Sequence, residues 1–187
     1  VSIRGFARQL QNGDLTEEQK KEYINIIVSE SERLANMSSS VLLLSKLENQ
    51  QIVSDQTEFD LDEQIRKCIL LLEKEWNDKN IEFDIDLDPI KYTFNEEMLS
   101  HVFINLFSNS IKFTQSGGII GCKLYRQENN VVFEISDNGI GMNEETQSRI
   151  YEKFYQGDTS HSEMGNGIGL NIVKRIVTLA EGSIDVQ

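Results

Sequence analysis

Two glycine-rich hexapeptides constrain this 187-residue chain more than any other feature. The first, DNGIGM at 137–142, follows an alternating apolar run at 131–136 that predicts a strand. The second, GNGIGL at 165–170, leads into an apolar amphipathic segment that predicts a helix ending near Ala180, with Gly182 as its stop. More than twenty mostly polar residues separate the two hexapeptides. This combination predicts a nucleotide pocket with a mobile cover.

Composition narrows the function classes. The net charge of −13 argues against nucleic acid or an anionic membrane as a partner, because such partners are bound by clusters of Lys and Arg. No run of about 18 apolar residues predicts a membrane span, and no signal peptide is recognisable. Cys68 and Cys122 lie in apolar runs without a CxxC motif, which predicts two buried reduced thiols and a cytoplasmic setting.

The first 49 residues predict a helical hairpin. Residues 1–12 have the spacing of a helix that ends at Gly13, and Thr16 with Gln19 predicts the capping box of a second helix that runs to residue 49. The apolar residues of that helix follow a heptad repeat: Ile27, Leu34, Met37, Val41 and Leu44. We expect two copies of the hairpin to form a four-helix bundle; the alternative is that the stripe packs on the rest of the same chain.

The remainder predicts an α+β domain after a polar linker at 49–58. We expect a helix over 59–80, a strand over 81–87 that Pro89 breaks, and a helix over 95–113. Two strands follow at 119–126 and 131–136, joined by a short connection, and then a short helix at 144–151. The segment 156–167 is small, polar and rich in glycine, as in a lid.

Three polar residues share one side of the predicted helix 95–113. Asn105 and Asn109 are four apart, and Lys112 is three further on. One interpretation is a solvated polar stripe. The other is a site for a magnesium triphosphate, in which a carboxamide oxygen binds the metal and the ammonium meets the phosphates, because Mg²⁺ prefers oxygen ligands and one protein ligand suffices when phosphates supply others.

The hexapeptides carry the remaining candidate chemistry. Asp137-Asn138-Gly139 has the sequence of a hairpin turn, but the residues after it do not alternate as a returning strand would. The functional interpretation is that the Asp137 carboxylate accepts a hydrogen bond from a base, while glycines let the backbone come close. Main-chain amides at the start of the helix after GNGIGL suit phosphate. Neither a P-loop nor a dinucleotide fingerprint is present, because no glycine precedes a lysine and the GxGxG spacing follows a loop.

Together these motifs resemble the transmitter region of a sensor histidine kinase. NLFSNSIKFT (105–114) is similar to the asparagine box of that family, YEKFYQGD (151–158) to its phenylalanine box, and the two hexapeptides to its glycine boxes. The resemblance implies a dimerisation and phosphotransfer hairpin at 1–49, a linker at 50–58 and an ATP-binding domain at 59–187. That domain would be a two-layer α/β sandwich of the Bergerat type shared with DNA gyrase and Hsp90.

The resemblance also implies a role for each matching residue. Asn105 would hold Mg²⁺, Asn109 and Lys112 would meet the phosphates of ATP, Phe113 would pack on adenine, and Asp137 would bond the exocyclic amine. Gly139 and Gly141 would shape the pocket, and Lys153 with Gly167 and Gly169 would close the lid. Gly165 and Leu170, at the ends of the second hexapeptide, complete the predicted set.

The resemblance implies autophosphorylation of a histidine and transfer of the phosphoryl group to an aspartate on a response regulator. The chain departs from the family at several points. VSIRGFARQL resembles the residues just after the acceptor histidine, so we expect the nucleophile to be absent from this stretch. His101 is expected on the surface or in a positioning role, and His161 is expected to be a solvated lid residue.

Further departures keep other functions open. Gln156 stands where a basic residue is common, and we expect the last strand of the family to be missing from the sheet. The intact protein would be cytoplasmic in this region and could be anchored in the cell membrane elsewhere. The alternatives are a nucleotide-binding scaffold without transfer activity, or an ATP-driven clamp like the gyrase relatives. The heptad hairpin argues against the clamp.

Overall fold

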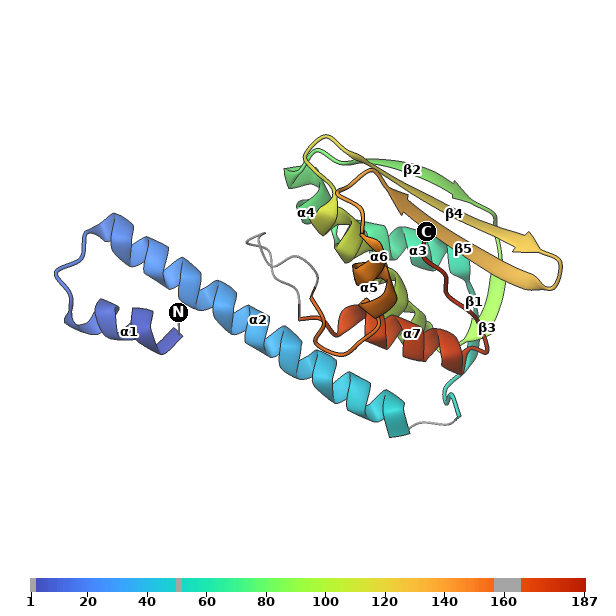
Figure 1. Cartoon of the computed structure of the whole chain (residues 1–187), viewed down its shortest axis with the longest axis horizontal. Coiled ribbons are helices and arrows are strands. Elements are labelled where there is room, and N and C mark those ends of the chain that lie inside the picture. Colours follow the sequence, from blue (N-terminus) through green and yellow to red (C-terminus); the bar gives the residue numbers. More distant parts are fainter. Residues whose placement is uncertain (1–2, 50–51, 157–165) are drawn as a thin grey trace. The chain divides into compact units, whose positions relative to one another are not determined.

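The computed structural model describes residues 3–49, 52–156 and 166–187. The chain forms two compact units, Val1–Ser45 and Lys46–Gln187 (Figure 1). Among the described residues, no helix is both long enough and apolar enough to cross a bilayer. The predicted boundaries of hairpin, linker and ATP-binding domain stay predictions.

The first unit is the predicted helical hairpin. It comprises α1 (Ile3–Asn12) and most of α2 (Glu17–Asn49). The expected capping box is present, because Thr16 N donates to Gln19 Oε1 at 3.0 Å and Gln19 N donates to Thr16 Oγ1 at 3.2 Å. The rings of Phe6 and Tyr23 lie 5.0 Å apart, which joins the two helices across the turn.

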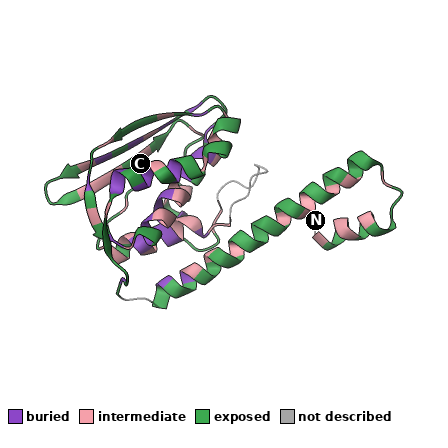
Figure 2. Ribbon diagram, turned by 180° about the vertical axis from the view of Figure 1, so that it is seen from behind, coloured by how far each residue is buried: buried purple, intermediate pink, exposed green. Residues whose placement is uncertain are grey.

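Part of the apolar heptad stripe of α2 is exposed in the single chain. Leu34 is 52% exposed and Val41 is 40% exposed, and Figure 2 shows exposed residues along most of this helix. A short α1 does not cover a stripe that runs the length of a 33-residue helix. The exposure therefore leaves an apolar surface of the kind that helical bundles bury.

The second unit contains a three-stranded sheet in the order β2-β4-β5. Its strands are β2 (Glu82–Leu87), β4 (Ile119–Gln127) and β5 (Asn130–Asp137). β2 runs parallel to β4, and β4 runs antiparallel to β5 through the predicted short connection. In this register Cys122 lies between Ile85 and Ile135. Cys68 and Cys122 are both buried free thiols, as predicted.

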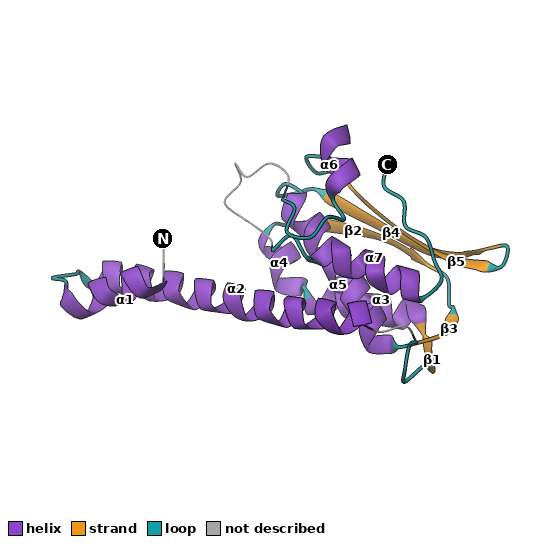
Figure 3. Ribbon diagram, turned by 60° about the horizontal axis from the view of Figure 1, so that its bottom comes forward, coloured by secondary structure: helices purple, strands orange, loops and turns teal. Residues whose placement is uncertain are grey.

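Helices cover one face of this sheet (Figure 3). They include α5 (Glu96–Phe113), whose Asn95 cap accepts a hydrogen bond from Met98 N at 2.9 Å, and α7 (Gly169–Leu179). Phe107 of α5 lies 6.0 Å from the ring of Phe83 on β2 and 6.0 Å from that of Phe133 on β5. These edge-on aromatic contacts fix α5 against the sheet, so the residues on its opposite side have defined positions.

The predicted helix over 59–80 is wrong. Residues 57–60 form β1 (Thr57–Asp60), which pairs antiparallel with β3 (Lys91–Phe94), and the helical part is divided into α3 (Leu61–Leu71) and α4 (Glu73–Asp78). Phe59 and Asp60 have the apolar–polar alternation of a strand, but the helical spacing begins only at Leu61. Asp60 is extended (φ −83°, ψ 105°) and stands just before α3. The missed β3 is the partner that makes β1 a strand.

The short helix after β5 and the end of α7 can also be compared with the prediction. The short helix expected at 144–151 is α6 (Glu144–Arg149). α7 ends at Leu179, with Ala180 as its cap and close to the predicted end, and Glu181 after it has the left-handed conformation (φ +57°). Glu181 N donates to Thr178 O at 3.1 Å and Gly182 N to Val177 O at 2.9 Å, which is a Schellman motif. Residues 183–187, after α7, do not form a strand.

Candidate functional site

The polar side of α5 meets the start of α7 at Asn105. The Asn105 amide nitrogen donates to His101 O one turn earlier at 2.7 Å, which fixes the orientation of the carboxamide. A Cβ built on Gly169 would lie 2.3 Å from Asn105 Oδ1, so only glycine leaves room for this oxygen. The asparagine motif of α5 and the second glycine-rich hexapeptide, which are far apart in the sequence, are therefore in direct contact.

Asn109 and Lys112 continue the same side of α5 and are partly buried. The Lys112 ammonium lies 4.9 Å from the ring centre of Phe113, and that ring is 40% exposed at the end of the helix. An exposed aromatic beside a cation suits a flat base attached to an anion. Asn105, Asn109, Lys112 and Phe113 thus all lie on α5, and Asn105 also contacts the start of α7.

The first hexapeptide is held against the end of α5. Gly139 N donates to Asp137 Oδ1 at 3.1 Å, and Ile140 N donates to Phe113 O at 3.3 Å. A Cβ on Gly139 would lie 2.5 Å from Phe113 O, which requires glycine at this position. Gly141 has a φ of +68°, which also favours glycine. Gly139 therefore lies close to the main chain of α5, and its approach to a bound base stays a prediction.

Asp137-Asn138-Gly139 is not a hairpin turn, because no strand returns along β5 in the described residues after it. Asn138 instead caps the neighbouring strand, since its Oδ1 accepts a hydrogen bond from Ile119 N at 2.9 Å. Sequence reasoning missed this role. The signal was present, because Asn side chains often hydrogen-bond main-chain amides where strands end.

The second hexapeptide packs on the segment before the predicted lid. Gly167 has a φ of +64°, and its carbonyl accepts a hydrogen bond from Phe154 N at 2.7 Å. A Cβ on Gly167 would lie 2.7 Å from the Phe154 carbonyl carbon, so glycine is required here as well. Ile168 is fully buried before α7 begins. Gly165, His161 and most of the predicted lid lie outside the described residues.

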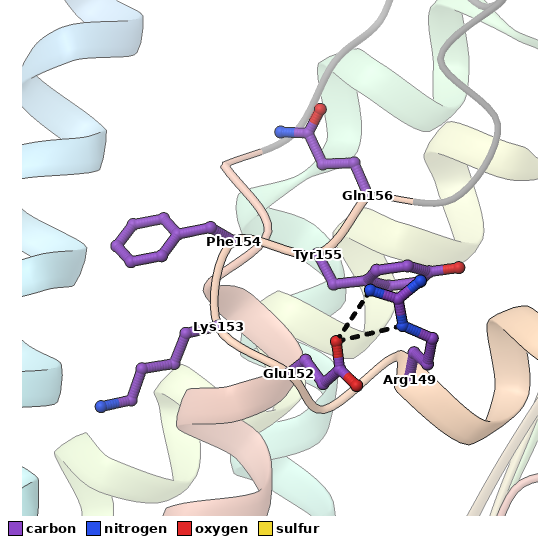
Figure 4. A pocket seen from close by; sticks show the side chains of 6 residues that line it. All are labelled: Arg149, Glu152, Lys153, Phe154, Tyr155 and Gln156. Carbon is purple, nitrogen blue, oxygen red and sulfur yellow. Dashed lines mark hydrogen bonds and ion pairs between the residues drawn. The ribbon is translucent and has the colours of Figure 1, made fainter.

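The side chains of Arg149 and of residues 152–156 line an open hollow of about 570 Å³ (Figure 4). Arg149 pairs with Glu152 at 3.1 Å, and its guanidinium lies 4.3 Å from the ring centre of Tyr155. Hydrogen bonding to Glu152 raises the pKa of Arg149 above its usual value. The hollow lies in the segment that leads into the predicted lid and does not include the polar side of α5.

Lys153 and Phe154 point away from the Arg149–Glu152 pair in Figure 4. Phe154 is 57% exposed and has a φ of +64°, a conformation that is rare for a residue other than glycine. The Lys153 ammonium pairs with the carboxylate of Glu48 in the last turn of α2. In this structure Lys153 is therefore engaged by the chain's own carboxylate, where the prediction gave it a phosphate.

The side chains of this site offer Mg²⁺ few ligands of their own. Among the described residues, no group of three or more His, Cys, Asp and Glu side chains could hold a metal ion. A metal at this site would depend on a carboxamide oxygen such as Asn105 Oδ1 together with oxygens of the bound ligand. That arrangement fits Mg²⁺, which takes oxygen ligands and often relies on substrate phosphates.

Sequence reasoning also missed Lys79, whose ammonium contacts the end of α5. Its Nζ donates to Ile111 O at 2.9 Å and to Lys112 O at 2.8 Å. No motif connects these positions, because Lys79 lies more than thirty residues earlier in the sequence. His101 is partly buried on α5, and its main-chain carbonyl is the group that orients Asn105.

Comparisons with known proteins agree with this geometry. The family model "Histidine kinase-, DNA gyrase B-, and HSP90-like ATPase" matches residues 94–187, which defines the class as an ATP-binding domain on a two-layer α/β fold. The model "His Kinase A (phospho-acceptor) domain" matches residues 1–50, the hairpin. The chain belongs to the sensor histidine kinases, and it is a transmitter region of that family. The predicted family and fold class are confirmed.

The chain is 33% identical over 172 residues to the heme sensor protein HssS of Staphylococcus saprophyticus, covering 92% of this chain and 37% of that protein. It thus spans little more than a third of the length of this relative. Histidine kinase ThkA, solved in complex with the response regulator protein TrrA, matches with a TM-score of 0.76 and 26% identity, over 96% of this chain and 50% of that chain. Full-length ShkA, solved with AMPPNP, matches with a TM-score of 0.75 and 27% identity, over 97% and 38%.

Proposed function

We propose that the chain binds magnesium ATP between the polar side of α5, the DNGIGM turn and the start of α7. The observation that carries the proposal is the contact of Asn105 with Gly169, because it joins the asparagine box to the second glycine box at one point. ATP bound there would serve as the phosphoryl donor of a protein-histidine kinase. Phosphoryl transfer of this kind depends on positioning and charge stabilisation.

The proposed roles carry the family resemblance over to the matching side chains of this site. Asn105 Oδ1 would bind Mg²⁺, which would neutralise phosphate charge, and Asn109 with Lys112 would contact the phosphates. Phe113 would pack on adenine, and Asp137, at the exposed end of β5, would accept from its exocyclic amine. Gly139, Gly141, Gly167 and Gly169 would keep the backbone close around the ligand, with Leu170 in the first turn of α7. Gly165 and Lys153 would belong to the lid, and Lys153 would leave Glu48 to do so.

In the intact protein, the phosphoryl group would move first to a histidine nitrogen on the hairpin and then to an aspartate of a response regulator. The only histidines of this chain, His101 and His161, lie outside α1 and α2. Neither histidine is therefore the proposed acceptor. A positioning role near the reacting groups is proposed for His101, because its carbonyl orients Asn105.

The hairpin would pair with a second copy to form a four-helix bundle. This assembly would bury the exposed part of the heptad stripe, including Leu34 and Val41. The other proposed partner is the receiver domain of a response regulator, as in the solved complex of ThkA with TrrA. We place the region in the cytoplasm, which supplies ATP and whose reducing environment keeps both cysteines as thiols.

The test is a calorimetric titration of the chain with ATP in the presence and absence of Mg²⁺. Asn105→Ala should weaken Mg²⁺-dependent binding about tenfold or more, since a metal ligand would be lost. Asn166→Ala is the control, because it removes the same kind of side-chain amide from the second hexapeptide at a residue with no proposed contact to metal or phosphate. Equal losses in the two variants would mean that the metal is not held at Asn105.

A further inference from the structure

Lys79 connects the junction of α4 and β2 to the end of α5. Its ammonium donates to Ile111 O at 2.9 Å and to Lys112 O at 2.8 Å, with a longer contact to Thr114 O at 3.4 Å. Its own main-chain carbonyl accepts a hydrogen bond from Gly117 N at 2.8 Å. One residue thereby holds both the last turn of α5 and the turn that follows it.

An ammonium is well suited to the C-terminal end of α5. The last four carbonyls of a helix have no partner within the helix, and they carry the negative end of its dipole. An ammonium offers three N–H donors and a positive charge, which match that need. The Phe113 carbonyl, which lies between the Lys79 contacts, accepts from Ile140 N of the DNGIGM turn at 3.3 Å. The end of α5 is therefore held by Lys79 and by the first hexapeptide.

We propose that Lys79 is a positioning residue of the nucleotide site, an inference that rests on the proposed function. The turn that it holds carries Lys112 and Phe113, the proposed contacts of phosphate and adenine. Lys79 contacts main-chain oxygens of α5, so it acts through the backbone and needs no contact with ATP. Its ammonium keeps the Lys112 and Phe113 side chains pre-organised, which lowers the ordering cost of binding.

The experiment measures ATP affinity of the 187-residue chain by calorimetry. Lys79→Met keeps the length of the side chain and removes the ammonium, and it should weaken ATP binding roughly fivefold to twentyfold, which is within the range of interaction energies measured between residues in contact. Lys74→Met is the matched control, because this exposed lysine on α4 changes the net charge equally. An equal affinity of Lys79→Met and the unchanged chain would refute the inference.

A double-mutant comparison separates positioning from general destabilisation. If Lys79 acts by placing Lys112, Lys79→Met should cost clearly less in a Lys112→Met background than in the unchanged chain. If Lys79→Met weakens ATP binding by the same factor in both backgrounds, Lys79 does not act by placing Lys112. Lys79→Arg, which retains the positive charge, should recover most of the affinity, and failure to recover any would count against the charge argument.

Hydrogen exchange supplies a readout that needs no nucleotide. In Lys79→Met the Thr114 amide, which donates to Ser110 O at 2.9 Å, and the Ile140 amide should exchange faster than in the unchanged chain, while amides of β4 keep their rates. Unchanged exchange at both positions would refute the inference. If Lys79→Met does not fold, Lys79→Gln, which retains an amide donor, takes its place in each measurement. Absence of ATP binding by the unchanged chain would instead refute the proposed function.

Discussion

The contact of Gly169 with Asn105 makes a prediction about stability that can be worked from the structure. In Gly169→Ala the added Cβ would lie 2.3 Å from Asn105 Oδ1 and 3.2 Å from Asn105 Cγ. Ordinary contact begins at 3.4 Å, so the Asn105 carboxamide or the first turn of α7 must move by about 1 Å. Moving the carboxamide weakens its 2.7 Å hydrogen bond to His101 O.

The magnitude combines opposing terms. Overpacking of a well-packed contact costs about 1–3 kcal/mol, and a lost hydrogen bond adds about 1 kcal/mol. Alanine in place of glycine gains up to about 1 kcal/mol from helix propensity, and less at the first helical position. We therefore expect Gly169→Ala to destabilise the domain by roughly 1–3 kcal/mol, and to weaken Mg²⁺-dependent ATP binding by about tenfold, because Asn105 is displaced.

The decisive assay is urea unfolding of four proteins: the unchanged chain, Gly169→Ala, Asn105→Ala and the double variant. Asn105→Ala removes Oδ1 and Cγ, and the remaining Asn105 Cβ lies 3.7 Å from the added methyl group, an ordinary contact. Gly169→Ala should then be neutral or stabilising by up to about 1 kcal/mol in the Asn105→Ala background. An equal cost in both backgrounds would show that the contact with Asn105 is not the reason for glycine.

Three other changes have expected outcomes. Glu48→Gln should tighten ATP binding about twofold to fivefold in calorimetry, because the half-exposed Lys153 is released, whereas Glu17→Gln, which breaks the pair with Lys20 on the same helix, should have no effect. If the hairpin forms the proposed dimer, Leu34→Glu should make the chain monomeric in sedimentation, while Ser39→Glu, at an outward heptad position, should leave it dimeric. A dimeric Leu34→Glu variant would refute the bundle. Burial raises the pKa of the Cys122 thiol to about 11. The stability that the neutral thiol contributes is therefore complete below about pH 9 and is lost as the pH rises through about 11. The urea midpoint should decrease over that pH range, and it should decrease less in Cys122→Ala.

The regular elements of the chain could be predicted because their signals are local. The capping box at Thr16 and the heptad pattern predicted α2, and the strand–turn–strand pattern predicted β4 and β5. The error at residues 59–80 has a local cause too. Phe59 lies two residues before Leu61, so the apolar pattern of a strand runs into that of a helix without a glycine or proline between them. Only the pairing of Phe59 with Tyr92 across two strands distinguishes the states.

The contacts of the candidate site, in contrast, depend on how helices pack together and not on local signals. Sequence motifs identified Asn105 and Gly169 separately, since an asparagine inside an apolar helix and a glycine at a helix start are each unusual. Their contact could not be predicted from spacing, because it depends on how α7 packs against α5. Lys79 had no signal at all, since a lysine before a strand is common and its partners are main-chain oxygens of any sequence. Glycines and amides thus mark where a pocket forms, but the residues that hold its backbone become visible only in the fold.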